Sequence, residues 1–184
     1  MIGTLALIVV IAILIVYIII IFNSLVSLKN NIGKAYANID VLLKQRNDEL
    51  PNLINTVKGY MKYENNLLII LTKARTSFLN AKTVSQKATV DDSITNTLRS
   101  IFAVAENYPK LKANDNFMLL QKRISGLENE IADRREFYND SVNNYNIRIQ
   151  SFPDIIFAKL FGFNEQILFK ATKEEKDKLE FDIK

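Results

Sequence analysis

The sequence contains no cysteine, no histidine and no tryptophan, and only 5 glycines and 3 prolines among its 184 residues. Without cysteine the chain forms no disulfide and offers no thiolate to a metal or a covalent intermediate. Without histidine it has no Ser-His-Asp triad, no HExxH zinc motif and no Glu-x-x-His di-iron motif. No glycine-rich phosphate loop is present either. These absences close the common routes to catalysis, and we expect a protein with no enzymatic activity, no cofactor and no metal.

One long apolar run occupies the N-terminal end. Leu5 to Phe22 contains no charged residue, and the first charge in the chain is Lys29. A helix needs about 20 apolar residues to cross a hydrocarbon core of about 30 Å. A cleaved signal peptide would instead have a basic start, a shorter apolar region and a small-residue cleavage site, all of which this segment lacks. The run therefore predicts a transmembrane anchor over residues 1–22.

Basic residues lie on only one side of this anchor. None precedes it, whereas Lys29, Lys34, Lys44 and Arg46 follow it. The positive-inside rule predicts a single-pass protein of the cell membrane with its N-terminus outside and its body in the cytoplasm. The basic excess over residues 23–90 fits either attraction to anionic lipid or an ordinary solvated surface. No nucleic-acid recognition motif is evident, so we expect the lipid bilayer but no nucleic acid among the partners.

Apolar residues recur at helical spacing through the rest of the chain, with no alternating strand pattern. A seven-residue repeat covers residues 113–150, and shorter stripes cover 50–78 and 94–108. The sequence predicts an all-α fold, in which the transmembrane helix continues into a long antiparallel up-and-down four-helix bundle. The bundle is expected over 23–163, ending in a short apolar helix, and a C-terminal tail over 164–184.

Prolines and polar stretches mark the expected helix ends. Pro51 either opens the second helix of the bundle or kinks one continuous helix. Residues 81–90 are polar and weakly periodic, so we expect the longest loop there. Asp91, Asp92 and Ser93 are the candidates for capping the helix that follows.

A short apolar segment follows the long helix. If the chain reverses near residue 50, the up-and-down order returns this segment to the membrane surface. If Pro51 only kinks a continuous helix, the segment is expected far from the membrane. Two interpretations remain open: the segment closes the end of the bundle, or it contacts lipid or another membrane protein. The candidate contact residues are Phe152, Pro153, Ile155, Ile156, Phe157, Leu160, Phe161 and Phe163.

Polar residues near the apolar stripes also allow more than one interpretation. An amide stripe along the long helix fits a solvated face, an interhelical hydrogen-bond ladder or a partner surface. Charged residues beside core positions are expected to form ion pairs that flank the core. Carboxylate catalysis would need a cleft that a filled bundle seldom has. The amides are Asn139, Asn143, Asn146 and Gln150; the charged residues are Arg46, Glu64, Arg75, Glu106, Glu128 and Arg135.

Several motifs, in order along the chain, resemble the LemA family. They include AYANIDV at 35–41, DELPNLI at 48–54, ENYPKLKAN at 106–114, RREFYNDSV at 134–142 and FGF at 161–163. The resemblance implies a bacterial single-pass membrane protein with a cytoplasmic helical bundle. Members of that family are often encoded near HtpX-type membrane zinc metalloproteases, and one branch serves in magnetosome formation.

Two functions are consistent with this resemblance. In the first, the protein is an adaptor or assembly factor for membrane protein complexes, with an HtpX-type membrane metalloprotease as one partner. In the second, it is a structural scaffold that self-assembles into homo-oligomers at the membrane surface. An adaptor is expected to co-purify with a defined partner, whereas a scaffold is expected to form large particles alone.

Overall fold

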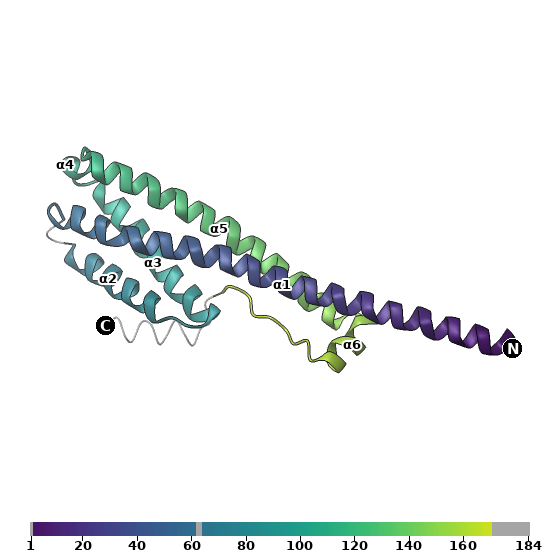
Figure 1. Cartoon of the computed structure of the whole chain (residues 1–184). Helices are drawn as coiled ribbons and strands as arrows, with labels where there is room; N and C mark the ends of the chain where they lie inside the picture. Colours follow the sequence, from purple (N-terminus) through teal and green to yellow (C-terminus); the bar gives the residue numbers. More distant parts are fainter. Residues whose placement is uncertain (1, 62–63, 171–184) are drawn as a thin grey trace. The chain divides into compact units, whose positions relative to one another are not determined.

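The computed structural model describes residues 2–61 and 64–170, and these residues contain helices and no strand. The all-α fold is therefore confirmed for this part of the chain, and the seven-residue repeat forms one long helix, α5. The antiparallel four-helix order stays a prediction. The helices, shown in Figure 1, are α1 (Ile2–Lys58), α2 (Asn65–Asn80), α3 (Val84–Ala105), α4 (Pro109–Lys112), α5 (Asp115–Gln150) and α6 (Asp154–Phe161).

The chain divides into two compact units, and α1 and α5 contribute residues to both. Unit 1 comprises residues 2–36 and Phe137–Ile167. Unit 2 comprises Ala37–Glu136 together with residues 168–170. The predicted division into anchor, bundle and tail concerns location relative to a membrane rather than packing, and it stays a prediction. Most of the predicted tail, residues 171–184, lies outside the described residues.

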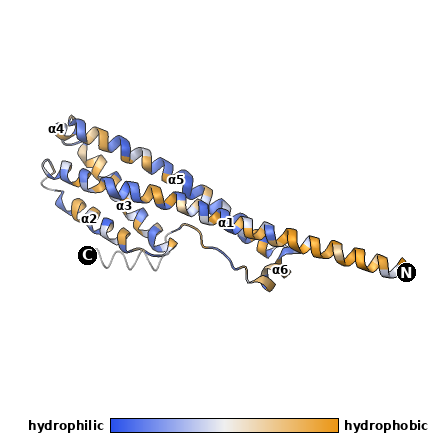
Figure 2. Cartoon of the chain, in the orientation of Figure 1, coloured by the Kyte–Doolittle hydropathy of each residue, from blue (hydrophilic) through white to orange (hydrophobic). Residues whose placement is uncertain are grey.

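The N-terminal part of α1 is the one helix in the described residues that is long and apolar enough to cross a membrane. Its side chains are exposed from Ile2 to Tyr17, and Ile21 is the first that is buried. Figure 2 shows the apolar colour along this end of the helix. A helix that is apolar on every face and not covered by protein matches a lipid environment. The sequence-based prediction of one candidate transmembrane helix is confirmed.

α1 continues through Pro51 without a break. Proline has no N–H, so the carbonyl of Asn47 lacks its usual helical donor at this point. The chain reversal expected near residue 50 comes after Lys58 instead, where Met61 N donates to the Val57 carbonyl at 3.0 Å. α1 extends only about two turns beyond Pro51, and Phe22 of α1 meets Phe161, so the continuous helix does not separate the short apolar segment from the end of the apolar run. The location of that segment relative to a membrane stays a prediction.

The expected loop over residues 81–90 is also mostly wrong, since α3 begins at Val84. A capping box starts this helix: Thr83 Oγ1 accepts from Gln86 N at 3.1 Å, and Gln86 Oε1 accepts from Thr83 N at 3.2 Å. This reciprocal pair satisfies two N–H groups that a helix start leaves open. Asp91 consequently lies inside α3 and is buried rather than capping it.

Side chains from α1, α2, α3 and α5 form the core of unit 2. Phe102 of α3 and Phe117 of α5 meet edge-on with their ring centroids 6.3 Å apart. Lys87 of α3 pairs with Asp40 of α1. Packing of these stripes, rather than helix propensity alone, stabilises the long helices. The core residues include Ile39, Leu43, Leu50 and Leu53 of α1, Leu71 of α2, Ile94, Leu98 and Ile101 of α3, and Ile124 and Ile131 of α5.

Candidate membrane-facing site

In unit 1, α6 has the reverse of the polarity usual for a helix in water. Asp154 and Ala158 are buried, whereas Ile156 and Leu160, one turn apart, are 55% and 73% exposed. Phe152, just before the helix, is 83% exposed. A helix in water normally turns its large apolar residues toward the protein and its carboxylates outward. The outward side of α6 therefore matches an apolar neighbour better than it matches water.

The buried carboxylate of α6 is held by an ion pair. Arg148 Nε, near the end of α5, donates to Asp154 Oδ2. Ile155 N also donates to the Ser151 carbonyl at 2.8 Å across the turn between the two helices. These two contacts fix the rotation of α6, because a charge-assisted hydrogen bond is strong enough to keep its carboxylate inward. Ile156 and Leu160 consequently point outward, whereas Ile155 and Phe157 are half-buried.

α6 lies beside the end of the apolar run of α1 (Figure 1). The ring of Phe22 meets Phe161 and Phe163 edge-on, with centroid distances of 5.1 and 5.8 Å. The Lys29 ammonium lies 5.9 Å from the centroid of the Phe163 ring. These separations are favourable for aromatic pairs and for a cation over an aromatic face. The aromatic cluster thus holds α6 where the apolar sequence gives way to polar sequence.

Gly162 ends α6 and allows both rings to reach Phe22. Its φ of 71° lies in the left-handed region, which residues with a Cβ adopt at a cost. Phe163 N donates to the Ala158 carbonyl at 2.9 Å, which closes the helix end. The chain turns at this point, so Phe161 and Phe163 flank the same ring.

The predicted contact residues therefore lie in one stretch but not on one face. Half of them are exposed and half are partly covered by the rest of unit 1. Their contact with lipid or with a partner stays a prediction. The exposed residues are Phe152, Ile156, Leu160 and Phe161; the half-buried ones are Pro153, Ile155, Phe157 and Phe163.

The segment 164–167 lies along α5 and is held mainly through its main chain. Asn146 Nδ2 donates to the Gln166 carbonyl and Asn146 Oδ1 accepts from Gln166 N, both at 2.9 Å. The hydroxyls of Tyr138 and Tyr145 donate to two further carbonyls of the segment, at 2.8 and 3.1 Å. Burial raises the pKa of both tyrosines, so they retain the donated proton. Asn146 and Gln150 of the predicted amide stripe thus bond to the non-helical segment after α6, rather than across two helices as an interhelical ladder would.

We expect Asn146→Ala to loosen this segment. The change leaves the N–H and carbonyl of Gln166 without their partners, which costs about 1–3 kcal/mol of local stability. Amide exchange at Gln166 should then accelerate roughly 5- to 150-fold. Hydrogen-exchange mass spectrometry of the full chain measures this, with Asn143→Ala, at an exposed position of the same helix, as the control. Equal exchange in the two variants would contradict the main-chain ladder.

In unit 2, a buried ionic cluster joins three helices through Arg46, which is 0% exposed. Arg46 Nη2 donates to Asp91 Oδ1 at 2.6 Å, and Nη1 donates to Glu128 Oε1 at 2.5 Å and Thr95 Oγ1 at 3.0 Å. The Thr95 hydroxyl donates in turn to Glu128 Oε2 at 2.8 Å. Arg135 Nη1 donates to the other oxygen of Asp91 at 3.0 Å. α1, α3 and α5 are therefore connected by charge-assisted bonds.

Burial and the neighbouring arginines have opposite effects on the Asp91 carboxyl. Burial raises the pKa of Asp91 above its ordinary value of 3.8, while Arg46 and Arg135 act in the opposite direction. A buried ion pair adds little net stability, but removal of one partner leaves an expensive unpaired charge. The cluster therefore constrains which helices pack together, as expected for charges beside the core.

Of the six charged residues predicted to pair beside the core, Arg46, Glu128 and Arg135 form ion pairs, and both arginines pair with Asp91. Sequence reasoning missed Asp91, which it treated as a capping candidate. A signal was available, because Asp91 continues the apolar stripe of α3 backward at helical spacing from Ile94. Of the remaining charged residues, Glu64 accepts from the Tyr108 hydroxyl at 2.6 Å.

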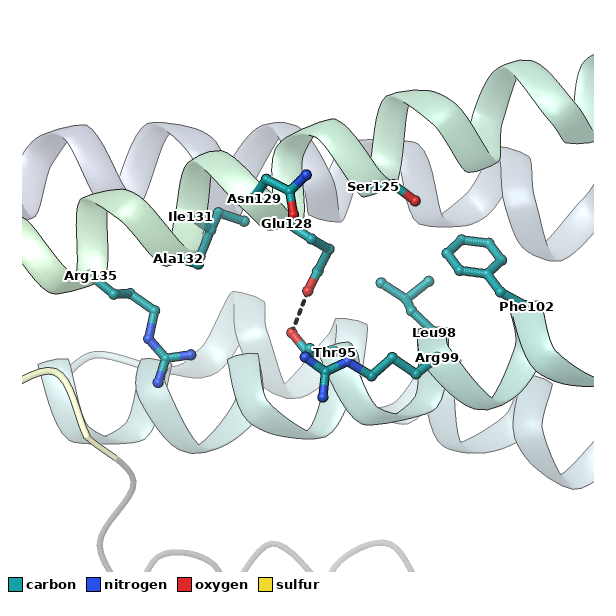
Figure 3. A pocket seen from close by; sticks show the side chains of 10 residues that line it. All are labelled: Thr95, Leu98, Arg99, Phe102, Ser125, Glu128, Asn129, Ile131, Ala132 and Arg135. Atoms are coloured by element: carbon teal, nitrogen blue, oxygen red, sulfur yellow. Dashed lines mark hydrogen bonds between the residues drawn. The ribbon is translucent and has the colours of Figure 1, made fainter.

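A groove of about 310 Å³ opens beside the cluster, between α3 and α5 (Figure 3). Arg99 on its rim is exposed and pairs with no carboxylate in the described part of the chain. Glu128 in the groove already accepts from Arg46 and Thr95, so it is not a free base. The groove suits binding better than acid–base chemistry. It is lined by Thr95, Leu98, Arg99 and Phe102 from α3, and by Ser125, Glu128, Asn129, Ile131, Ala132 and Arg135 from α5.

Residues 35–182 match the sequence profile of the LemA family. The chain belongs to the LemA family. The resemblance carried by the motifs is thereby confirmed. The candidate span and the membership of this family together indicate a membrane-associated helical protein. In residues 2–61 and 64–170, no three His, Cys, Asp or Glu side chains gather in a way that would hold a metal ion.

Sequence identity to individual relatives is modest. Protein LemA of Metamycoplasma hominis is 28% identical over 159 residues, which cover 84% of this chain and 71% of that protein. Magnetosome proteins MamQ 1 and MamQ 2 of Paramagnetospirillum magneticum are each 23% identical over 175 residues. Those matches cover 81% of this chain and 64% of each magnetosome protein. The chain thus spans just under two thirds of the magnetosome relatives.

Proposed function

We propose that the protein is a non-enzymatic, membrane-anchored adaptor or assembly factor for membrane protein complexes. The observation that supports this most is that α1 carries both the candidate membrane span and Arg46. Arg46 bonds to side chains of α3 and α5, the two helices that line the groove. One helix therefore links the chain to a membrane and organises a surface that a partner can bind.

The surface we assign to the partner is the α3–α5 groove. Its rim carries the exposed Arg99, and the half-buried Phe102 supplies apolar area beside it. This combination is complementary to an amphipathic segment that carries a carboxylate. The carboxylate inside the groove, Glu128, already accepts hydrogen bonds from Arg46 and Thr95, which favours binding over catalysis.

The orientation we propose places the groove in the cytoplasm. Lys29 and Lys34 follow the apolar run closely, and basic residues are retained on the cytoplasmic side. Membrane proteins with cytoplasmic segments are then the accessible partners. An HtpX-type membrane zinc metalloprotease is the first to test, since genes for LemA-family members often lie near those of such proteases.

The test is native purification of the full chain in mild detergent, with size measurement and mass spectrometry of the co-eluting proteins. We expect stoichiometric co-elution with a membrane protein, and a loss of that protein from the Arg99→Glu variant. Lys122→Glu, an exposed charge reversal on α5 outside the groove, is the matched control and should retain the partner. A large particle of this chain alone would favour the self-assembling scaffold. A bare monomer would overturn both functions.

A further inference from the structure

We propose that the outward side of α6 forms a second membrane contact, which inserts into the interface of a bilayer containing anionic phospholipid. The contact surface consists of Phe152, Ile156, Leu160 and Phe161, here called the α6 face. This inference rests on the membrane anchoring in the proposed function but requires no protein partner.

The position of α6 along α1 sets the depth of the α6 face. At 1.5 Å per residue, residues 2–22 span about 31 Å, close to the thickness of a hydrocarbon core of about 30 Å. When this segment crosses a bilayer, Phe22 lies at the boundary between acyl chains and headgroups. Phe161 packs on Phe22 with ring centroids 5.1 Å apart. The α6 face is consequently level with the interface.

The orientation of α6 makes this face chemically suited to lipid. The single carboxylate of the helix, Asp154, is buried against Arg148. Four large apolar side chains within ten residues remain 45% to 83% exposed, although Phe161 also packs on Phe22. Isolated exposed apolar residues are common on soluble proteins, whereas a cluster marks a contact surface. Continuity with the membrane span, through Phe22, identifies the bilayer as the occupant.

Charges around the face select the headgroup. Lys159 lies on α6 and Lys29 beside Phe163, and both are exposed. The exposed carboxylate that follows α6, Glu165, accepts a hydrogen bond from Gln150 Nε2 at 2.7 Å. Lysine stems lie along apolar surface while their ammonium groups reach phosphates. A basic rim around an apolar centre is the pattern of interfacial helices that bind anionic lipid.

Because the chain has no tryptophan, one introduced tryptophan reports its own depth. The full chain would be reconstituted in vesicles with brominated acyl chains, made of phosphatidylcholine alone or mixed with phosphatidylglycerol. Phe152→Trp reports on the α6 face, Leu14→Trp on the span, and Phe137→Trp on an exposed position of α5, about 20 Å from the end of that helix. We expect brominated lipid to remove most fluorescence from F152W and L14W but not from F137W.

The headgroup preference has a separate expected result. Quenching of F152W should be stronger with phosphatidylglycerol present, and Lys159→Glu should weaken it there. Loss of one basic charge near an anionic surface alone should raise the detached fraction of the α6 face about fivefold, and the added carboxylate should raise it further. Lys122→Glu, outside unit 1, is the matched charge reversal and should have no effect. Equal quenching in both lipids would overturn the anionic preference.

The tryptophans at positions 152 and 14 test the lipid contact of the α6 face and the membrane anchor separately. An unquenched F152W beside a quenched L14W would overturn the lipid contact, leave the anchor intact and favour a protein as the occupant. An unquenched L14W would overturn the anchoring on which both proposals rest. A quenched F152W in a protein that purifies without a partner would support the lipid contact while counting against the adaptor.

Discussion

Replacing Arg46 with methionine is expected to destabilise the protein by about 3–5 kcal/mol. The change leaves Asp91 buried without the guanidinium that now lies 2.6 Å from it, and it removes a partner of Glu128. Methionine fills the space of the aliphatic stem but donates no hydrogen bond. For a chain of this size the loss corresponds to a fall in Tm of roughly 6–20 °C. Circular dichroism of the full-length protein in mild detergent measures the shift.

Lys44→Met is the matched control, because it removes one cation from the same helix at an exposed position. Surface substitutions of this kind change stability by about 0.5 kcal/mol or less. If the two variants melt at the same temperature, the cluster does not hold α1, α3 and α5 together. The pairing would then be an incidental consequence of packing by the apolar stripes.

The loss of stability in the Arg46→Met variant, relative to the parent protein, should also become smaller as the pH falls. Arg46 lowers the pKa of Asp91, so its removal lets burial raise that pKa further above 3.8. A carboxyl with a higher pKa in the folded chain than in the unfolded chain binds its proton more tightly when folded. The stability that this carboxyl contributes is therefore greatest below its pKa in the unfolded chain. It is lost as the pH rises through its pKa in the folded chain. Melting at neutral and mildly acidic pH, beside the parent protein, should show the two Tm values converging toward acid.

The parts of the fold that the sequence predicts well depend on local periodicity. A seven-residue repeat marks α5, and an uncharged apolar run marks the span, whatever surrounds them. Pro51 shows where local propensity misleads: Leu50, Leu53 and Val57 are fully buried, and their packing keeps α1 continuous through the proline. Compositional reasoning likewise missed the start of α3, although the Thr83–Gln86 capping box was readable.

The candidate sites were harder to predict because they depend on which helices become neighbours. Arg46 and Asp91 are 45 residues apart, and nothing local to either specifies the other. The composition of α6 predicted a contact segment, but its outward face depends on the Arg148–Asp154 pair and on Phe22. The ladder from Asn146 to the main chain of Gln166 left no pattern beyond the amide stripe.

Three arginines in the middle of the apolar run are expected to release the protein from the membrane, whereas one is not. The 16 Leu, Ile, Val and Phe residues of 2–22 contribute roughly 5–10 kcal/mol to insertion at about 0.3–0.6 kcal/mol each. Each central Ile→Arg change costs about 3–4 kcal/mol, counting the lost isoleucine. Ile11→Arg alone therefore leaves insertion favourable, and Ile8→Arg/Ile11→Arg/Ile15→Arg makes it unfavourable.

Membrane fractionation after an alkaline wash distinguishes these outcomes, because the wash strips chains held only by the α6 face and leaves an inserted helix in place. The triple Ile→Leu variant at the same positions is the control for changed packing and should stay in the membrane pellet. Retention of the triple arginine variant after the wash would show that residues 2–22 are not the anchor. Release of the single Ile11→Arg variant would instead show that the margin for insertion is smaller than the apolar residues imply. Binding of the triple variant before the wash but not after it would be the result expected from a chain that has lost its span and kept the α6 face.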